Sequence, residues 1–278
     1  MKKFLAIIFA TIMMVAVLAS CSGDETGGSG DELRGTVTLN GSTSVDTVIT
    51  LLGEAFRELH PNVLVNFNPT GSGSGIEAAQ NANVHIGLSS RNLRPERGET
   101  GVSALQFAVD GLAVIVHPSN PVQNLTIAQI AAIYTGEITN WSEVGGQDRP
   151  IAVIGRDSAS GSRGAFDEII GIVDRTAHDE EHASGGSVIT SVAGNPNAIG
   201  YGSLSGVNAT VSAISVEGVA ITNATLQDGS FPVARPFIFV LNDDVTLPAH
   251  AQAFIDFVMS PAATELIARA GVLQAALD

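Results

Sequence analysis

From residue 34 onward, apolar and polar residues follow two alternating periods along the chain. Short apolar runs of strand length predict strands at 36–40, 63–67, 84–88, 112–117, 151–154, 198–201, 211–216 and 237–241. Apolar residues spaced three or four apart predict helices at 45–59, from 76, and at 127–134, 165–172, 249–259 and 262–270. Strands that alternate with helices in this way predict an α/β fold with largely parallel sheets. This part of the chain is about 245 residues long, which exceeds the usual single open sheet, so we expect two lobes.

The pattern before residue 34 is different and predicts a signal peptide followed by a flexible tether. Lys2 and Lys3 precede an apolar run at 4–19, which is short for a membrane span but typical of a signal-peptide core. The run ends in Leu-Ala-Ser before Cys21, which resembles a bacterial lipobox with cleavage after residue 20 and a diacylglycerol on the cysteine thiol. A plain secretory signal with a chance cysteine is the alternative. Residues 21–33 are rich in Gly, Ser and acidic residues and read as a flexible tether, which would hold the protein on the outer face of the membrane.

Composition excludes several classes of protein. Hydrophobic residues make up 45% of the chain and charged residues only 15%, which is not the composition of a disordered chain. There are 28 Asp and Glu against 13 Lys and Arg, and both lysines lie at the N-terminus, so a mature surface this acidic would repel nucleic acid. Cys21 is the single cysteine, which excludes an intrachain disulfide and a cysteine-based zinc cluster.

Three turns between a predicted strand and a predicted helix share one composition. Residues 41–44, 71–75 and 158–162 consist almost entirely of Gly, Ser and Thr. The first turn of a helix has unpaired N–H groups and a partial positive charge, and hydroxyl side chains add further donors. Each turn is therefore a candidate anion site. Ordinary helix capping, which favours the same residues, is the alternative for any one turn.

Two arginines follow the ends of predicted strands. Arg91 comes after the strand at 84–88, and Arg156 comes after the strand at 151–154. In open α/β sheets the carboxyl ends of the strands face the ligand crevice, and a guanidinium matches two oxygens of an anion at once. Both arginines are candidate ligand contacts, with a surface ion pair as the alternative.

Other motifs do not indicate catalysis. His178 and His182 have the spacing of a zinc-binding helix, but a zincin requires Glu after the first histidine and Asp179 stands there. We read this stretch as a solvated acidic loop. The 71–75 turn has glycine where a nucleophile elbow requires serine, and the sequence has no P-loop. The sequence marks no catalytic base, no metal set and no cofactor motif.

A longer series of motifs resembles a known family. The chain carries, in order, GSTSV at 41–45, GSGSG at 71–75, SSR at 89–91, VDGLAVIVHPSNPVQNLT at 109–126, YTGEITNWSEVGG at 134–146, IGRDSASGSRGAF at 154–166, NAIGYGSLS at 197–205 and RPFIFV at 235–240. From about residue 35 to the C-terminus, this series is similar to the phosphate-binding lipoproteins of bacterial phosphate ABC transporters. The resemblance implies a two-lobed periplasmic-binding-protein fold of type II with an anion in the cleft between the lobes. It implies that residues 34–109 and 226–278 form one lobe and residues 110–225 the other.

The resemblance also implies which residues contact phosphate. By position they come from the three turns and one clamping arginine: Thr43, Ser44, Ser72, Ser160, Gly161, Ser162 and Arg156. Position 90 departs from the best-known branch of the family, in which an aspartate accepts the proton of hydrogen phosphate. This chain has Ser90 there, followed by Arg91, which would replace some of that chemistry.

This departure concerns the choice between phosphate and sulfate. Hydrogen phosphate carries a proton that a carboxylate accepts, whereas sulfate carries none at neutral pH and is repelled. Since a serine both donates and accepts, Ser90 alone should discriminate poorly. Asp110 is our first candidate for the missing acceptor, with a hinge acid as the alternative. Asp46 is the second, with a helix-start acid as the alternative.

The sequence therefore predicts an extracytoplasmic, lipid-anchored protein that binds inorganic phosphate and delivers it to the membrane permease of an ABC transporter. It predicts no enzymatic step, cofactor, metal or nucleic-acid partner. A binding protein for another tetrahedral oxyanion, such as sulfate or molybdate, stays open. A serine-dependent phosphoesterase and a structural surface protein are more distant alternatives.

Overall fold

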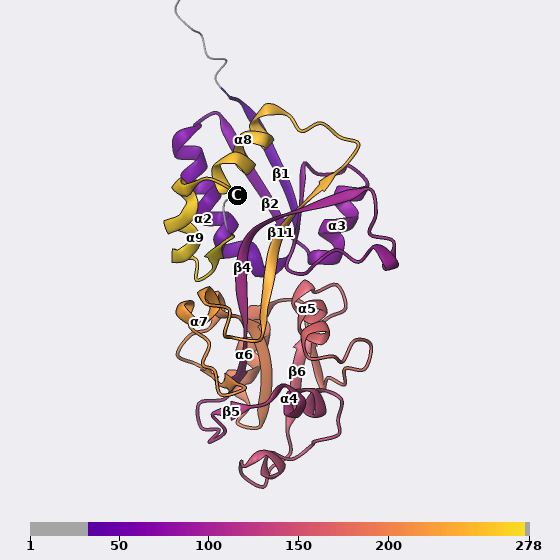
Figure 1. The fold of residues 1–278 in the computed structure, drawn as a ribbon, viewed down its shortest axis with the longest axis vertical. Coiled ribbons are helices and arrows are strands. Elements are labelled where there is room, and N and C mark those ends of the chain that lie inside the picture. The colour runs from indigo at the N-terminus through magenta and orange to yellow at the C-terminus, as the bar shows by residue number, and fades with distance from the viewer. Residues whose placement is uncertain (1–32, 276–278) are drawn as a thin grey trace, which may run out of the picture. The chain divides into compact units, whose positions relative to one another are not determined.

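The computed structural model describes residues 33–275 of the 278-residue chain (Figure 1). The signal peptide, Cys21 and the tether expected from the sequence lie outside these residues. Among the helices described, none has the length and apolar character that crossing a membrane requires.

Helices and strands alternate along most of the described chain. The helices are α2 (Asp46–Leu59), α3 (Ser72–Gln80), α4 (Ile127–Tyr134), α5 (Gly161–Ile169), α6 (Gly185–Gly194), α7 (Asn223–Gln227), α8 (Ala249–Val258) and α9 (Thr264–Arg269). The strands are β1 (Gly35–Gly41), β2 (Val63–Pro69), β3 (Ile86–Ser89), β4 (Val102–Val116), β5 (Asn124–Leu125), β6 (Ala152–Arg156), β7 (Glu180–His182), β8 (Ala198–Ser203), β9 (Ser212–Ala213), β10 (Ser215–Val216), β11 (Ala234–Asn242) and β12 (Leu273–Gln274). This alternation confirms the predicted α/β class.

The main sheet is mixed, which corrects the prediction of largely parallel sheets. Its strand order is β2-β1-β3-β11-β4-β8-β6-β7. The outer strands pair in parallel, β1 with β2 and β3, and β6 with β7 and β8. In the middle of the order, β11 is antiparallel to both β3 and β4, and β4 is antiparallel to β8. The parallel βα units are therefore joined by two long antiparallel strands.

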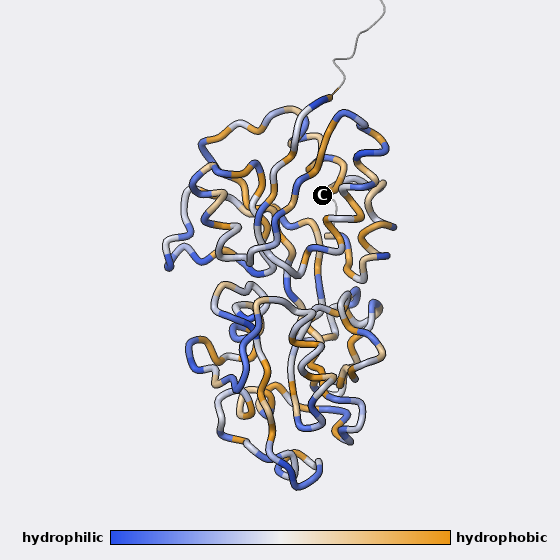
Figure 2. The backbone as a smooth tube through the Cα atoms, turned by 180° about the vertical axis from the view of Figure 1, so that it is seen from behind, coloured by the Kyte–Doolittle hydropathy of each residue, from blue (hydrophilic) through white to orange (hydrophobic). Residues whose placement is uncertain are grey.

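Two hydrophobic clusters lie at opposite ends of these long strands. Cluster A packs α2, α8 and α9 on β1, β3 and part of β4, and cluster B packs α4, α5 and α6 on β6, β8 and the rest of β4. Strand β4 gives Phe107 and Ala108 to cluster A and the residues from Leu112 to its end to cluster B. Strand β11 runs back beside it (Figure 1). In Figure 2 the orange, apolar stretches lie within each cluster, and the two strands between the clusters are blue.

The positions of the crossings follow from these clusters. Asp110 on β4 is the register partner of Arg235 on β11, at the point where the strands pass from one cluster to the other. Phe231 and Val233 still pack in cluster B. The lobe boundaries stay a prediction, and we propose that the return crossing falls near Arg235 rather than at residue 226.

Several elements differ from the predicted ones where glycine, serine or isolated polar residues obscure the pattern. Helix α3 begins at Ser72 and α5 at Gly161, four residues before the predicted starts at 76 and 165, because Gly and Ser mask the first turn of each helix. Helix α6 begins with two glycines and has no predicted counterpart. Strand β4 is also longer than its predicted apolar part at 112–117, since exposed side chains alternate with buried ones near its start.

The segment around His178 differs from the predicted solvated loop. Residues Glu180–His182 form strand β7, which pairs in parallel with β6, and the His178 side chain is only 1% exposed. In extended backbone, residues four apart lie roughly 13 Å apart along the chain instead of one helical turn apart, so the zinc-helix reading of the two histidines does not apply. In residues 33–275, no group of three or more His, Cys, Asp or Glu side chains is placed to hold a metal ion.

Candidate functional site

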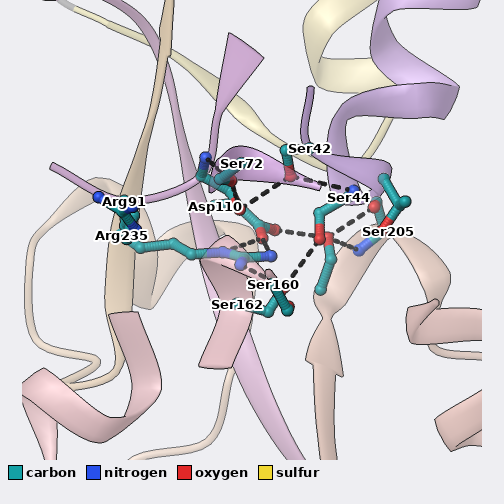
Figure 3. Close-up of polar contacts among 12 residues, drawn as sticks. Ser42, Ser44, Ser72, Arg91, Asp110, Ser160, Ser162, Ser205 and Arg235 are labelled. Carbon is teal, nitrogen blue, oxygen red and sulfur yellow. Dashed lines mark hydrogen bonds and ion pairs between the residues drawn. The ribbon is translucent and has the colours of Figure 1, made fainter. Parts of the chain in front are cut away.

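Serine hydroxyls from four separate parts of the chain meet beside the crossing strands (Figure 3). Ser42 Oγ donates to Ser90 Oγ at 2.8 Å, and Ser72 Oγ lies 3.3 Å from Ser90 Oγ. Ser44 Oγ lies 2.8 Å from Ser162 Oγ, although the two residues are 118 positions apart. We call Ser42, Ser44, Ser72, Ser90 and Ser162 the serine cluster. It brings together the three glycine- and serine-rich turns singled out in the sequence and the end of β3.

Each of the three turns opens a helix toward the cluster. Ser42 caps the short 3-10 turn at Thr43–Val45 by accepting from Ser44 N–H, and Ser160 caps α5 by accepting from Arg163 N–H. Helix α3 begins at Ser72 itself. Because the first N–H groups of a helix have no partner within it, the turns direct donors and partial positive charge toward the same place.

Glycine is required at one position in this arrangement. A Cβ atom on Gly161 would lie 1.9 Å from Ser72 Oγ and 2.6 Å from Ser90 Oγ. Any side chain there would displace both hydroxyls. Gly161 therefore lets the first turn of α5 approach the hydroxyls that come from β3 and α3.

Arg156, at the end of β6, is a buried cation beside this cluster. Its guanidinium donates to the carbonyls of His182 and Ala183 at 3.0 and 2.8 Å, and to Thr43 Oγ1 at 3.0 Å. All three acceptors are neutral, and in the described part of the chain no carboxylate lies within ion-pair distance of it. Burial lowers the pKa of Arg156 from its ordinary value; Tyr201 and the Asp157 charge oppose this, and the neighbouring Arg235 cation adds to the lowering. Within residues 33–275, the Arg156 charge therefore has no carboxylate in an ion pair with it.

Arg91 is also buried, but its charge is compensated. Its two terminal nitrogens donate to the two carboxylate oxygens of Glu99 at 2.9 and 2.6 Å, and one of them also donates to the carbonyl of Asn92. The guanidinium of Arg91, which we expected to bind a ligand, thus binds the carboxylate of Glu99. These hydrogen bonds do not support the predicted ligand contact of Arg91.

Asp110 reaches the cluster only through another residue, Arg235. Arg235 Nε and Nη2 donate to Asp110 Oδ2 at 2.9 and 2.8 Å, and Ser203 Oγ donates to Asp110 Oδ1 at 2.7 Å. Burial raises the pKa of Asp110, while Arg235, Ser203 and the backbone N–H of Leu204 oppose that rise. The third nitrogen, Arg235 Nη1, donates to Ser162 Oγ at 2.6 Å. The carboxylate therefore faces Arg235.

Arg235 is the residue of this site that sequence reasoning missed. It opens the RPFIFV segment, which was used only as a mark of resemblance. The sequence did contain a signal: Arg235 stands two residues before a buried apolar run, where a solvated arginine would be out of place.

A cavity of about 760 Å³ opens beside the cluster. Its wall includes Thr43 and Ser44, the other candidate acid Asp46, and Ser184 and Gly185 at the start of α6. The wall combines hydroxyl groups with apolar side chains, Pro69 and Ile189 among them. This cavity gives solutes a path to Thr43 and Ser44, and it is large compared with a tetrahedral oxyanion.

Known proteins resemble this chain in sequence and in fold. A phosphate ABC transporter substrate-binding protein from Clostridium perfringens, solved with bound phosphate, is 38% identical with a TM-score of 0.83, and the match covers 87% of this chain and all of that one. A phosphate transport receptor from Vibrio cholerae is 33% identical with a TM-score of 0.73, over 85% of this chain and 99% of that one. The phosphate-binding protein PstS of Borreliella burgdorferi is 28% identical over 98% of this chain and 99% of its own length.

The matches confirm the resemblance drawn from the sequence motifs and the periplasmic-binding-protein fold that it implied. A family model described as a PBP superfamily domain matches residues 26–262, which is most of the chain. The chain belongs to the periplasmic-binding-protein (PBP) superfamily.

Proposed function

We propose that this protein is an extracytoplasmic solute-binding protein that captures inorganic phosphate and delivers it to the permease of an ABC transporter. The observation that carries the proposal is Arg156, a buried guanidinium with only neutral partners among the described residues, beside a cluster of hydroxyls. A buried charge is costly unless something compensates it, and an oxyanion between Arg156 and the cluster would do so. The relatives named for phosphate binding support inorganic phosphate as that anion.

We propose eight ligand contacts from the set that the sequence favoured: Thr43, Ser44, Ser72, Ser90, Arg156, Ser160, Gly161 and Ser162. Hydroxyl and backbone N–H donors surround the anion, and Arg156 supplies the charge. Arg91 and Asp110 have carboxylate or guanidinium partners within the protein, so we place them behind the contact set. The acidic surface does not oppose binding, because local donors in a desolvated site outweigh charges that salt screens.

The protein's place in the cell follows from the same proposal. We propose that Cys21 carries a lipid that ties the protein to the outer face of the cell membrane. The single cysteine stands at the position that a lipobox requires, which supports this assignment. The protein releases its ligand to the permease unchanged, and binding needs no covalent step.

Calorimetric titration with phosphate, then sulfate and molybdate, tests the proposal. We expect saturable binding of one phosphate per chain, with weaker binding of the other two anions. Tighter binding of sulfate or molybdate than of phosphate would assign the protein to another oxyanion. Turnover of a phosphomonoester would contradict a pure binding role.

A further inference from the structure

Arg235 links the crossing strands to the anion site. It is 2% exposed, and among the described residues its three guanidinium nitrogens donate to two side chains, Asp110 and Ser162. Two nitrogens bind one oxygen of Asp110, and Nη1 donates to Ser162 Oγ at 2.6 Å, the shortest contact in the serine cluster. Figure 3 shows the Arg235 side chain extending toward Ser162 and the cluster.

This contact decides what the Ser162 hydroxyl can do. A guanidinium only donates, so Ser162 Oγ must accept from Arg235, and its single proton is directed elsewhere. In this structure the remaining partner is Ser44 Oγ, at 2.8 Å. An anion that enters between these two hydroxyls would receive the same proton, so Arg235 fixes Ser162 as a donor to the ligand.

Asp110 is occupied on both oxygens. Oδ2 accepts twice from Arg235, and Oδ1 accepts from Ser203 Oγ, with the Leu204 N–H also directed at the carboxylate. A carboxylate has about four acceptor positions, and the three hydrogen bonds from Arg235 and Ser203 take most of them. A proton of hydrogen phosphate would therefore compete with these internal donors for the carboxylate.

We propose that Arg235 is a positioning residue of the anion site, which acts through Ser162 and is held in place by Asp110. This inference rests on the proposed function. The sequence-based hypothesis was that Asp110 accepts the phosphate proton. In the present proposal Asp110 instead holds Arg235, which in turn contacts Ser162.

A double-mutant cycle in phosphate affinity tests the link. Arg235→Gln should weaken binding by roughly 10- to 100-fold, because a charged hydrogen bond to the donor is lost. In a Ser162→Ala background the same change should cost less than about threefold, since the group that Arg235 positions is already absent. Equal losses in both backgrounds, or no loss in either, would overturn the inference. Arg97→Gln is the matched control, because Arg97 pairs with Asp174 at the surface.

Arg235→Gln leaves Asp110 buried without its cation, so this variant alone could fail to fold. The variant with both Arg235→Gln and Asp110→Asn removes both charges, and its cycle with Ser162→Ala gives the same readout. Thermal unfolding checks that each variant is folded before titration.

Asp110→Asn separates the two roles of the carboxylate. If Asp110 positions Arg235, phosphate and sulfate affinities should change by the same factor. A narrowed ratio, with sulfate bound more tightly than by the parent, would show that Asp110 accepts the phosphate proton and would overturn the inference. A parent protein that binds no phosphate would contradict the proposed function itself, and the inference with it; a parent that binds phosphate with no coupling between Arg235 and Ser162 would contradict the inference alone.

Discussion

Arg156 and Arg91 occupy comparable places in the fold, yet their surroundings differ in one respect. Arg156 is the last residue of β6, Arg91 lies two residues after the end of β3, and both are buried. Arg91 has Glu99 as a counter-ion, whereas Arg156 is held by two carbonyls and one hydroxyl. The comparison teaches that burial and strand position do not by themselves make an arginine a ligand contact. What matters is whether the protein has already neutralised its charge.

The energetics of the two residues differ accordingly. Breaking a buried ion pair leaves an uncompensated charge and destabilises the fold. The ion pair between Arg91 and Glu99 therefore stabilises the fold. Arg156 has no such pair in the described residues, and under the proposed function the ligand supplies the compensating charge. Substitutions at the two arginines should separate affinity from stability.

The largest expected effect is on affinity, at Arg156. Arg156→Ala should weaken phosphate binding by about 2–4 kcal/mol, because the ligand loses a charged hydrogen-bond partner in a desolvated site. Arg156→Lys should recover only part of this loss, since an ammonium cannot contact two oxygens as a fork. Calorimetric titration measures both. Arg91→Ala is the comparison variant. If it weakens phosphate binding as much as Arg156→Ala does, the proposed difference between the two arginines is wrong.

The next effect is on stability, at Glu99. Burial pushes the pKa of Glu99 upward, but hydrogen bonds from Arg91 and from the backbone N–H of Arg94 outweigh it and hold the pKa below its ordinary value. The ionised carboxylate therefore stabilises the fold at pH values above the ordinary glutamate pKa. This stabilisation is lost as the pH falls through the lowered pKa of Glu99. Glu99→Gln should cost about 2–3 kcal/mol of unfolding free energy at neutral pH.

Urea unfolding of the parent and of Glu99→Gln at neutral and acid pH checks this prediction. The difference between the two proteins should shrink in acid, because the parent then protonates the same carboxyl group. A difference that is absent at neutral pH would mean that Arg91 does not depend on its counter-ion.

A smaller effect concerns His178, which packs behind β6. A Cβ on Gly155, next to Arg156, would lie 2.1 Å from His178 Nε2. Burial lowers the pKa of His178, the hydrogen bond to Glu181 opposes this, and the Arg163 charge adds to the lowering. The unfolded chain therefore takes up the proton first as pH falls below the ordinary histidine value, and the fold loses stability in that range.

His178→Gln should flatten this part of the pH profile by about 1 kcal/mol per pH unit. Thermal unfolding at pH values on either side of the ordinary histidine pKa measures it. The matched control is His117→Gln, because His117 contacts Ser119 at the surface. An unchanged slope in His178→Gln would show that the neutral histidine beside Arg156 does not limit acid stability.

The sequence anticipated the turns better than the ion pairs. The glycine- and serine-rich turns at 41–44, 71–75 and 158–162 are local signals, and they do converge in the serine cluster. The pairing of Asp110 with Arg235, 125 residues away, depends on the register of β4 against β11, which no local pattern specifies. A role for Asp110 could be suspected from its position, but its partner could not.

The same limit applies to the fold. Strands with continuous apolar runs, such as the second half of β4, were predictable, whereas the antiparallel middle of the sheet was not. Helix α6 begins with two glycines, which indicate a loop by propensity, and only packing of its apolar face on β6 and β8 makes it a helix. Contacts between residues far apart in the sequence determine the strand directions in the middle of the sheet and the helical state of α6.

The most direct test of the central claim is a crystal structure of the protein with phosphate at saturating concentration. The account predicts one phosphate beside Arg156, with its oxygens within hydrogen-bond distance of that guanidinium and of hydroxyls of the serine cluster. Phosphate bound elsewhere, with Arg156 still bonded only to neutral groups of the protein, would contradict it.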